Sequence, residues 1–140
     1  MTRALFVGGT SSNAGKSWMA TAICAWLRGR GVSVAPFKAQ NMSNNSYPCR
    51  TGGEIGRAQV AQAEACGLEP EPAMNPILLK PSGNGASQVV VNGRVWKTLS
   101  AREHYAHADE LRRRGAGGVR GSVEPFRRDR HRRRRQRRPS

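Results

Sequence analysis

The chain has 140 residues, enough for one ordinary domain with a hydrophobic core, and a formal net charge of +15 at pH 7. Residues 1–110 carry 11 basic and 7 acidic side chains, whereas residues 111–140 carry 13 and 2. The charge is therefore a property of the C-terminal segment, and the first 110 residues have the composition of a mildly basic enzyme rather than of a nucleic-acid-binding domain.

The cysteine spacing and the hydropathy limit the cellular compartments that suit this chain. Cys24, Cys49 and Cys66 are odd in number and lack the C-x-x-C spacing of zinc sites, so the sequence indicates neither a disulfide framework nor a metal centre of that kind. No apolar stretch has the length of a signal-peptide core or a membrane span. We therefore expect a cytoplasmic protein with no membrane partner.

The first 37 residues predict a strand, a loop, a helix and a second strand. Residues 4–7 form a short apolar run that ends at two glycines, as expected of a buried parallel strand. Apolar side chains recur at helical spacing after Ser17, and Gly29 and Gly31 are expected to end this helix. The apolar, β-branched run at residues 32–37 predicts the second strand.

The glycine-rich loop predicts a phosphate-binding site at the helix N-terminus. Its backbone N–H groups would converge on a phosphate, Lys16 would reach the β- and γ-phosphates, and the Ser17 hydroxyl would bind Mg²⁺. The spacing departs from the common motif, because Gly9 and Gly15 enclose five residues instead of four and Thr10 stands where a glycine is expected. The alternative is an incidental Gly/Ser turn. The residues assigned to the nucleotide are Gly9, Thr10, Asn13, Ala14, Gly15, Lys16 and Ser17.

A second lysine follows the second predicted strand. Ligands of open α/β sheets bind at the carboxyl ends of the strands, so Lys38 is expected beside Lys16 and is predicted to share its catalytic role. The segment that follows, residues 39–46, is dense in amides and hydroxyls and cannot be core. It is either a solvated loop or part of a binding site.

Glu54 is predicted to start another helix, whose face of small residues runs to a stop at Gly67. A carboxylate at this position suits the helix dipole and needs no further role. The functional alternative is that Glu54 binds Mg²⁺ across from Ser17, because hard cations take carboxylate oxygen.

The remaining elements are predicted from short patterns. Residues 77–81 predict a buried strand, residues 88–96 a hairpin or edge strand, and residues 101–111 a helix. His104 and His107 lie one turn apart on that helix, but two histidines without a third ligand are expected to be surface residues.

Four blocks in order resemble the cobyric acid synthase family, the glutamine-dependent amidotransferases of cobalamin biosynthesis, whose N-terminal domain is similar to dethiobiotin synthetase. The blocks are Gly9-Thr10 through Gly15-Lys16-Ser17; Pro36-Phe37-Lys38 with Gln40-Asn41-Met42 and Asn45-Ser46; Gly52 through Gln59; and Met74-Asn75-Pro76 with Leu78-Leu79-Lys80-Pro81. The enlarged loop resembles that of the dethiobiotin synthetase group. The sequence departs from the family at Ala39, where a proline is usual, and at residues 47–50.

The resemblance implies an ATP- and Mg²⁺-dependent enzyme. The intact enzyme would use ATP to activate peripheral carboxylates of cobyrinic acid a,c-diamide, and glutamine-derived ammonia would convert the acyl phosphates to amides. Gln40, Asn41 and Asn45 are then candidates to bind the corrinoid. Residues 1–111 would be the beginning of the ATP-binding domain, and the glutaminase domain would be absent, so we expect this chain to be inactive alone.

Residues 112–140 are arginine-rich, with almost no core-forming side chains, and predict a disordered or transiently helical tail. The tail is either a basic arm that binds nucleic acid through phosphates, an unrelated fusion, or the product of a frameshift. Its last ten residues can be encoded so that reading one base later gives Thr-Val-Val-Glu-Gly-Ser-Gly-Ala-Pro-Ala, which resembles the Glu-Gly-Ala-Gly-like segment that the family should have next. We expect the frameshift.

The sequence thus predicts an α/β fold, a fragment of a P-loop NTPase-like parallel sheet flanked by helices, with a disordered tail. Two functions follow. The first is a fragment of an ATP-dependent amidotransferase. The second is a small P-loop nucleotide-binding protein whose basic tail contacts nucleic acid. An open sheet without its later strands leaves an unpaired edge, so we also expect poor solubility.

Overall fold

The computed structural model describes residues 3–116. Its helices are α1 (Lys16–Gly29), α2 (Arg57–Cys66) and α3 (Ala101–Ala106), the short 3-10 helix is η1 (Pro72–Met74), and residues 108–116 are also helical. Its strands are β1 (Gln40–Met42), β2 (Ser46–Pro48), β3 (Glu54–Gly56), β4 (Ile77–Ser82), β5 (Ala86–Val91) and β6 (Arg94–Ser100).

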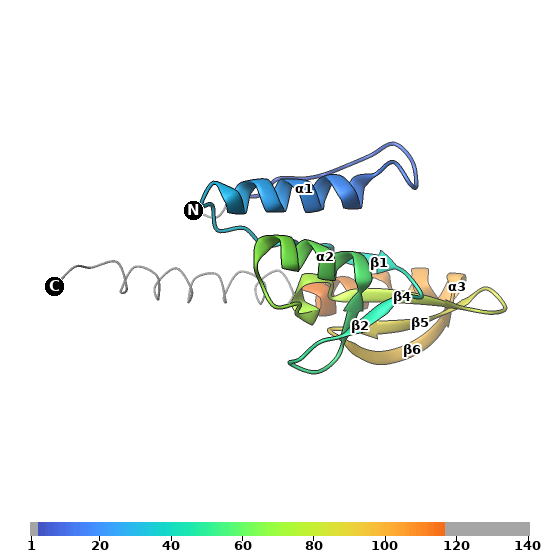
Figure 1. The fold of residues 1–140 in the computed structure, drawn as a ribbon. Coiled ribbons are helices and arrows are strands. Elements are labelled where there is room, and N and C mark those ends of the chain that lie inside the picture. Colours follow the sequence, from blue (N-terminus) through green and yellow to red (C-terminus); the bar gives the residue numbers. More distant parts are fainter. Residues whose placement is uncertain (1–2, 117–140) are drawn as a thin grey trace.

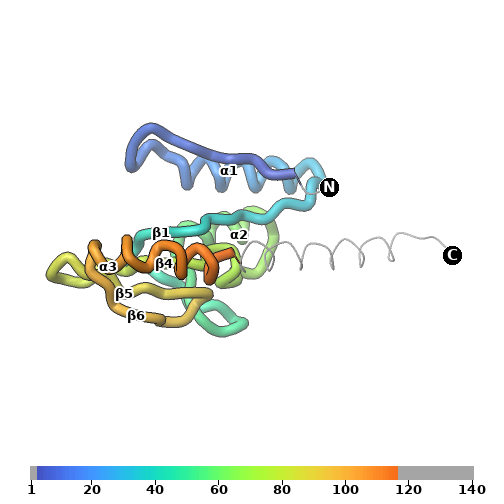
Figure 2. The backbone as a smooth tube through the Cα atoms, turned by 180° about the vertical axis from the view of Figure 1, so that it is seen from behind, coloured from blue at the N-terminus to red at the C-terminus, as the bar shows by residue number. Residues whose placement is uncertain are grey.

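The main sheet has four strands in the order β1-β4-β5-β6, and β2 pairs with β3 in a separate two-stranded sheet. In the main sheet β1 is parallel to β4, whereas β4, β5 and β6 are antiparallel to one another. Figure 1 shows α2 on one face of this sheet and α3 on the other, and Figure 2 shows the same arrangement from behind. The predicted α/β class is confirmed, with a mixed sheet in place of a parallel one.

The sheet face that carries α3 and the helical residues 108–116 holds the main hydrophobic cluster. Ile77, Leu79, Val89, Leu99 and Leu111 are buried together there. Residues 77 and 79 lie in β4, residue 89 in β5 and residue 99 in β6. Successive side chains of a strand point to opposite faces, so residues 77 and 79 lie on the same face of the sheet. The strand predicted at residues 77–81 and the hairpin predicted at residues 88–96 are confirmed.

The two N-terminal strands that the sequence predicts are wrong. Residues 4–7 and 32–37 are irregular, and Leu5 and Phe6 are 69% and 90% exposed. A strand needs a neighbour to pair with, and no strand among residues 3–116 pairs with either run. The segment before the loop instead runs back along α1, and together they form a layer beyond α2 (Figures 1 and 2).

Helix α1 is confirmed and is attached to the rest of the molecule mainly through α2. Cys24 of α1 and Cys66 of α2 are both buried, and each thiol shifts the pKa of the other. Arg28 Nη1 donates to the carbonyl oxygen of Glu64 at 3.3 Å. Large apolar side chains of α1 are exposed, among them Trp18 and Trp26.

Glu54 lies in β3 and not at a helix start, which corrects the prediction. It pairs with Pro48 of β2, and α2 begins three residues later at Arg57. The pairing partner comes from residues 46–48, a segment with no clear strand pattern in the sequence, so a local reading could not find it. The predicted helix stop is confirmed, because Gly67 caps α2 with a left-handed φ of 69°.

The boundary of the predicted tail also needs correction. Leu111 is buried in the main cluster and residues 112–116 continue the helix, so these five tail residues are ordered. The rest of the predicted tail lies outside the described residues.

Candidate nucleotide-binding site

The glycine-rich loop ends in the conformation that a helix N-terminal anion site requires. Asn13 and Gly15 have left-handed φ angles of 60° and 80°, and α1 begins directly afterwards at Lys16. Within the described residues no side chain caps this helix N-terminus. The first backbone N–H groups of α1 therefore keep their donors for a ligand, and they lie at the positive end of the helix dipole.

Lys16 folds back over the loop. Its Nζ donates to the carbonyl oxygen of Ser11 at 2.5 Å. A Cβ placed on Gly9 would lie 3.0 Å from Lys16 Cγ and 3.1 Å from Cδ, so the glycine leaves room for the lysine stem. The loop is exposed, and an anion can approach the ammonium group and the helix N-terminus from solvent.

Lys38 is the second lysine predicted to serve the phosphate loop. Partial burial, and then the positive charge of Lys16, lower the pKa of Lys38 below its ordinary value. The charge of Lys16 therefore acts on Lys38, and the expectation that both lysines serve one site stays a prediction. Two like charges held together without an anion disfavour each other, and a phosphate between them would relieve this repulsion.

Three buried amides hold Lys38 in place. Its Nζ donates to Asn41 Oδ1 at 2.8 Å, and Asn41 Nδ2 donates to Gln59 Oε1 of α2 at 3.1 Å. Asn75 Nδ2 donates to the carbonyl oxygen of Lys38 at 3.2 Å, while Asn75 Oδ1 accepts from Gly56 N at 3.2 Å. The lysine is therefore fixed at both its backbone and its ammonium group.

Glu54 is engaged elsewhere in the structure. Lys80 Nζ donates to its two carboxylate oxygens at 3.0 and 3.3 Å, and also contacts Ser46 Oγ at 3.3 Å. Burial alone would raise the pKa of Glu54, but the hydrogen bonds from Ser46 and Lys80 and the charge of Lys80 outweigh it and lower the pKa. Among the described contacts Glu54 thus pairs with Lys80 and Ser46, and Ser17 lies separately in the first turn of α1.

The candidate corrinoid residues differ in their exposure. Gln40 and Asn45 are exposed on the segment that leads through β1 to β2, whereas Asn41 is only 7% exposed. The backbone carbonyl of Asn45 accepts from Arg57 N at 3.1 Å, which ties this segment to the start of α2. Gln40 and Asn45 are therefore available to a ligand, and Asn41 belongs to the amide cluster around Lys38.

His107 contacts one residue of β6 and one residue of the C-terminal helical segment. The His107 ring meets the edge of Trp96 at 5.6 Å between centroids, and its Nδ1 lies 3.5 Å from Glu110 Oε2. In residues 3–116 no group of three or more His, Cys, Asp or Glu side chains is arranged to hold a metal ion.

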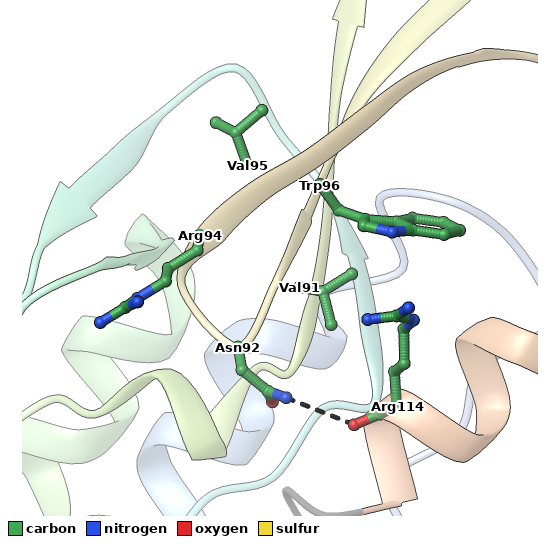
Figure 3. A pocket seen from close by; sticks show the side chains of 6 residues that line it. All are labelled: Val91, Asn92, Arg94, Val95, Trp96 and Arg114. Carbon is green, nitrogen blue, oxygen red and sulfur yellow. Dashed lines mark hydrogen bonds between the residues drawn. The ribbon is translucent and has the colours of Figure 1, made fainter.

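A separate hollow of about 280 Å³ lies beside Trp96. Figure 3 shows Trp96 and Arg114 facing each other there, with Asn92 Nδ2 donating to the carbonyl oxygen of Arg114 at 3.3 Å. The residues that line it are Val91, Asn92, Arg94, Val95, Trp96 and Arg114. They come from the β5–β6 hairpin and the C-terminal helical residues, and so this hollow shares no residue with the phosphate loop.

Sequence reasoning did not assign roles to Gln59, Asn75 or Lys80. Two signals in the sequence point to such roles: a glutamine on a helix face of small residues, and a lysine inside an apolar strand. Polar groups at such positions are expected to be buried, and buried polar groups need partners. Which partners they have depends on contacts between distant segments.

Residues 5–130 match the family described as the CobQ/CobB/MinD/ParA nucleotide binding domain. The chain belongs to this family. The expected resemblance to the cobyric acid synthases is confirmed as well: the chain is 55% identical over 111 residues to the cobyric acid synthase of Dehalococcoides mccartyi strain CBDB1, covering 79% of the chain and 22% of that protein. The match to the enzyme of Jannaschia sp. is 58% over 104 residues, covering 74% and 22%. That to the enzyme of Rhodococcus jostii is 56% over 109 residues, covering 78% and 21%.

The chain thus spans about a fifth of the length of these curated relatives. No solved structure matches it significantly. Across the described part of this member of the nucleotide-binding family, no helix combines the length and apolar character needed to cross a membrane.

Proposed function

We propose that this chain supplies the ATP-binding part of a cobyric acid synthase, with the phosphates bound at residues 9–17. The proposal is supported chiefly by the loop, whose helix N-terminus is uncapped among the described residues and which folds Lys16 back over itself. The charge of Lys16 also acts on Lys38. The family match and the curated relatives support ATP as the nucleotide that binds.

The proposed residues suit carboxylate activation. When bound, ATP supplies the γ-phosphoryl group that makes a carboxylate oxygen a leaving group, and ammonia then displaces phosphate to form the amide. The N–H groups of residues 13–16 would hold the phosphates, and Lys16 and Lys38 would neutralise the negative charge that develops during transfer. Transfer depends on positioning and charge stabilisation, so these cations are the proposed catalytic residues.

Mg²⁺ is proposed to bind at the Ser17 hydroxyl. This ion is usually held by one or two protein ligands together with phosphate oxygens, so a single hydroxyl on α1 is a sufficient protein ligand when the phosphates are bound. Glu54 as a second ligand would have to exchange Lys80 for the ion, because its carboxylate is engaged in the structure. Gln40 and Asn45 are the proposed contacts to the corrinoid amides and carboxylates. For Asn41, direct contact would require breaking one of its two side-chain hydrogen bonds.

Amidation by this chain alone is not expected. The chain spans about a fifth of its relatives, and glutamine-derived ammonia would come from a part of the intact enzyme that residues 3–116 do not contain. We further propose that residues 112–140 are read in a shifted frame. Sequencing the gene across codons 111–120 tests this: a gained or lost base relative to an intact relative is expected, and an uninterrupted frame with arginine-specific codon choice would contradict it.

Titration calorimetry with ATP tests the binding proposal. The full 140-residue chain is expected to bind ATP with Mg²⁺, and Lys16→Ala is expected to weaken binding at least tenfold, because a charge-assisted contact to phosphate is lost. Lys97→Ala is the matched control, since Lys97 lies over the Trp96 ring and away from the loop. If the natural chain bound no nucleotide, or if both variants bound like it, the proposal would be wrong.

The second candidate function, a basic arm for nucleic acid, depends largely on residues 117–140. These lie outside the described residues, and the structure favours no such role.

A further inference from the structure

Asn41 and Gln59 form a hydrogen-bonded chain that ends on the ammonium group of Lys38. The chain runs from α2 through β1 to the lysine, and its two bonds are 3.1 and 2.8 Å long. Asn41 is 7% exposed and Gln59 is 1% exposed, so the bond between the two amides is buried, whereas the bond to Lys38 is partly buried. Two segments that are distant in the sequence, residues 38–41 and α2, therefore determine where one charge lies.

The direction of each bond follows from the chemistry of the groups. An ammonium group has donors and no acceptor, so Asn41 must present its oxygen to Lys38. Its Nδ2 then faces away from the lysine and needs an acceptor because it is buried. Gln59 Oε1 is that acceptor. Gln59 thus decides which end of the Asn41 amide the lysine meets.

The packing around the Asn41 amide leaves it no freedom to turn. A Cβ placed on Gly56 would lie 2.3 Å from Asn41 Nδ2 and 3.2 Å from Gln59 Oε1, which means that this glycine backbone closes against the amide pair. Lys38 is held on its other side as well, because Lys38 N donates to the carbonyl oxygen of Met74 at 2.9 Å.

We propose that Asn41 and Gln59 are positioning residues that hold the Lys38 ammonium group at the phosphate loop before the nucleotide binds. This inference rests on the proposed function, because Lys38 is there a cation for the nucleotide phosphates. It gives Asn41 an indirect role in place of contact with the corrinoid. Holding two ammonium groups near each other is unfavourable in the free protein, and a buried amide dipole aimed at one of them offsets part of that cost.

The pH profile of Lys38 acylation distinguishes positioning from a purely structural role. If Asn41 and Gln59 only stabilised the fold, their substitution would not change the midpoint of this profile. Only the neutral amine reacts with acetic anhydride, so the midpoint of the profile, followed by peptide mass spectrometry, gives the pKa of the ammonium group. Lys97 in the same sample serves as the internal reference. Among residues 3–116 the charged group that bears on Lys38 is Lys16, and it is present in every variant.

Three variants separate positioning from stability. Gln59→Leu removes the acceptor, so the Lys38 midpoint is expected to fall because the Asn41 oxygen is no longer held toward the ammonium group. Gln59→Glu keeps the shape and an acceptor and adds negative charge, so the midpoint is expected to rise above that of the natural chain. Gln62→Leu is the matched control: Gln62 is also buried on α2, and among the described hydrogen bonds it has none to Lys38 or Asn41, so its midpoint should not change.

ATP binding by the same proteins completes the test. Gln59→Leu is expected to lose about tenfold in affinity, which is the scale of one hydrogen bond to a charged group, whereas Gln62→Leu should stay within about twofold. Unchanged Lys38 midpoints in both Gln59 variants, or equal losses of affinity in Gln59→Leu and Gln62→Leu, would overturn the positioning role.

The two proposals fail in different ways. If the midpoints move as expected but the natural chain binds no ATP, the positioning of Lys38 stands and the nucleotide-binding function is wrong. If the natural chain binds ATP but Gln59→Glu and Gln59→Leu leave the midpoint where it is, the function stands and the positioning role is wrong. Gln59→Glu is nearly isosteric, so this second comparison remains available even if Gln59→Leu does not fold.

Discussion

Substituting Gly56 by alanine tests the amide cluster on which the site depends. Gly56 has φ −65° and ψ 138°, angles that alanine adopts without strain, so the effect of the change is steric. The new methyl group would lie 2.3 Å from Asn41 Nδ2 and 3.2 Å from Asn75 Oδ1. Neither amide can move without losing a buried hydrogen bond.

The magnitude follows from two costs. Forcing one extra methyl group into a packed interior costs about 1–3 kcal/mol, and breaking a buried hydrogen bond costs about 1–3 kcal/mol more. We therefore expect Gly56→Ala to lower the free energy of unfolding by roughly 2–6 kcal/mol. Urea unfolding followed by circular dichroism measures this difference.

The matched control is Gly83→Ala. Gly83 has a φ outside the left-handed region, and a Cβ there would meet no described atom within 4 Å. Its substitution should change the free energy of unfolding by less than about 0.5 kcal/mol. Equal urea midpoints for the two variants would refute the packing of the amide cluster and with it the fixed position of Lys38.

The other predictions concern the ion pair on β3 and the N-terminal layer. Glu54→Gln is expected to lower the free energy of unfolding at pH 7 by about 1 kcal/mol, since the pair with Lys80 is partly exposed. Because folding depresses the pKa of Glu54, its contribution is present above the unfolded-state value of about 4.3 and is lost as the pH falls through the folded-state value, so the two proteins should converge near pH 3 in urea titrations. A difference that persisted there would show that the charge is not responsible. Hydrogen exchange should be fast at residues 4–7 and 32–37, which lie outside any sheet, and slow in β4 and β5; equal protection of all four segments would contradict the fold.

The sequence predicted those elements whose evidence is local. Helix α1 follows from apolar spacing after Ser17, and the β5–β6 hairpin is closed by Asn92 and Gly93, whose φ angles of 49° and 81° suit the tight turn between two strands. Those inferences needed no knowledge of distant partners. The rule that placed Lys38 beside Lys16 assumed a strand at residues 32–37, which the structure does not contain, so that placement stays a prediction.

The sequence could not predict the features that depend on distant partners. Residues 4–7 have the composition of a buried strand, but a strand forms only where another strand accepts its hydrogen bonds. The pairing of Glu54 with Pro48 has no local sign in the sequence, so the pattern around Glu54 predicts a helix start instead of a strand. The roles of Gln59 and Asn75 likewise became visible only when α2 and β4 were placed next to Lys38.

The central claim is that Lys16 and Lys38 together bind the phosphates of a nucleotide. Acylation of the full chain with and without ATP and Mg²⁺, read by peptide mass spectrometry, tests it most directly. ATP is expected to slow the modification of both Lys16 and Lys38 and to leave the modification rate of Lys97 unchanged. Modification of Lys16 and Lys38 at the same rate with and without saturating ATP would contradict it.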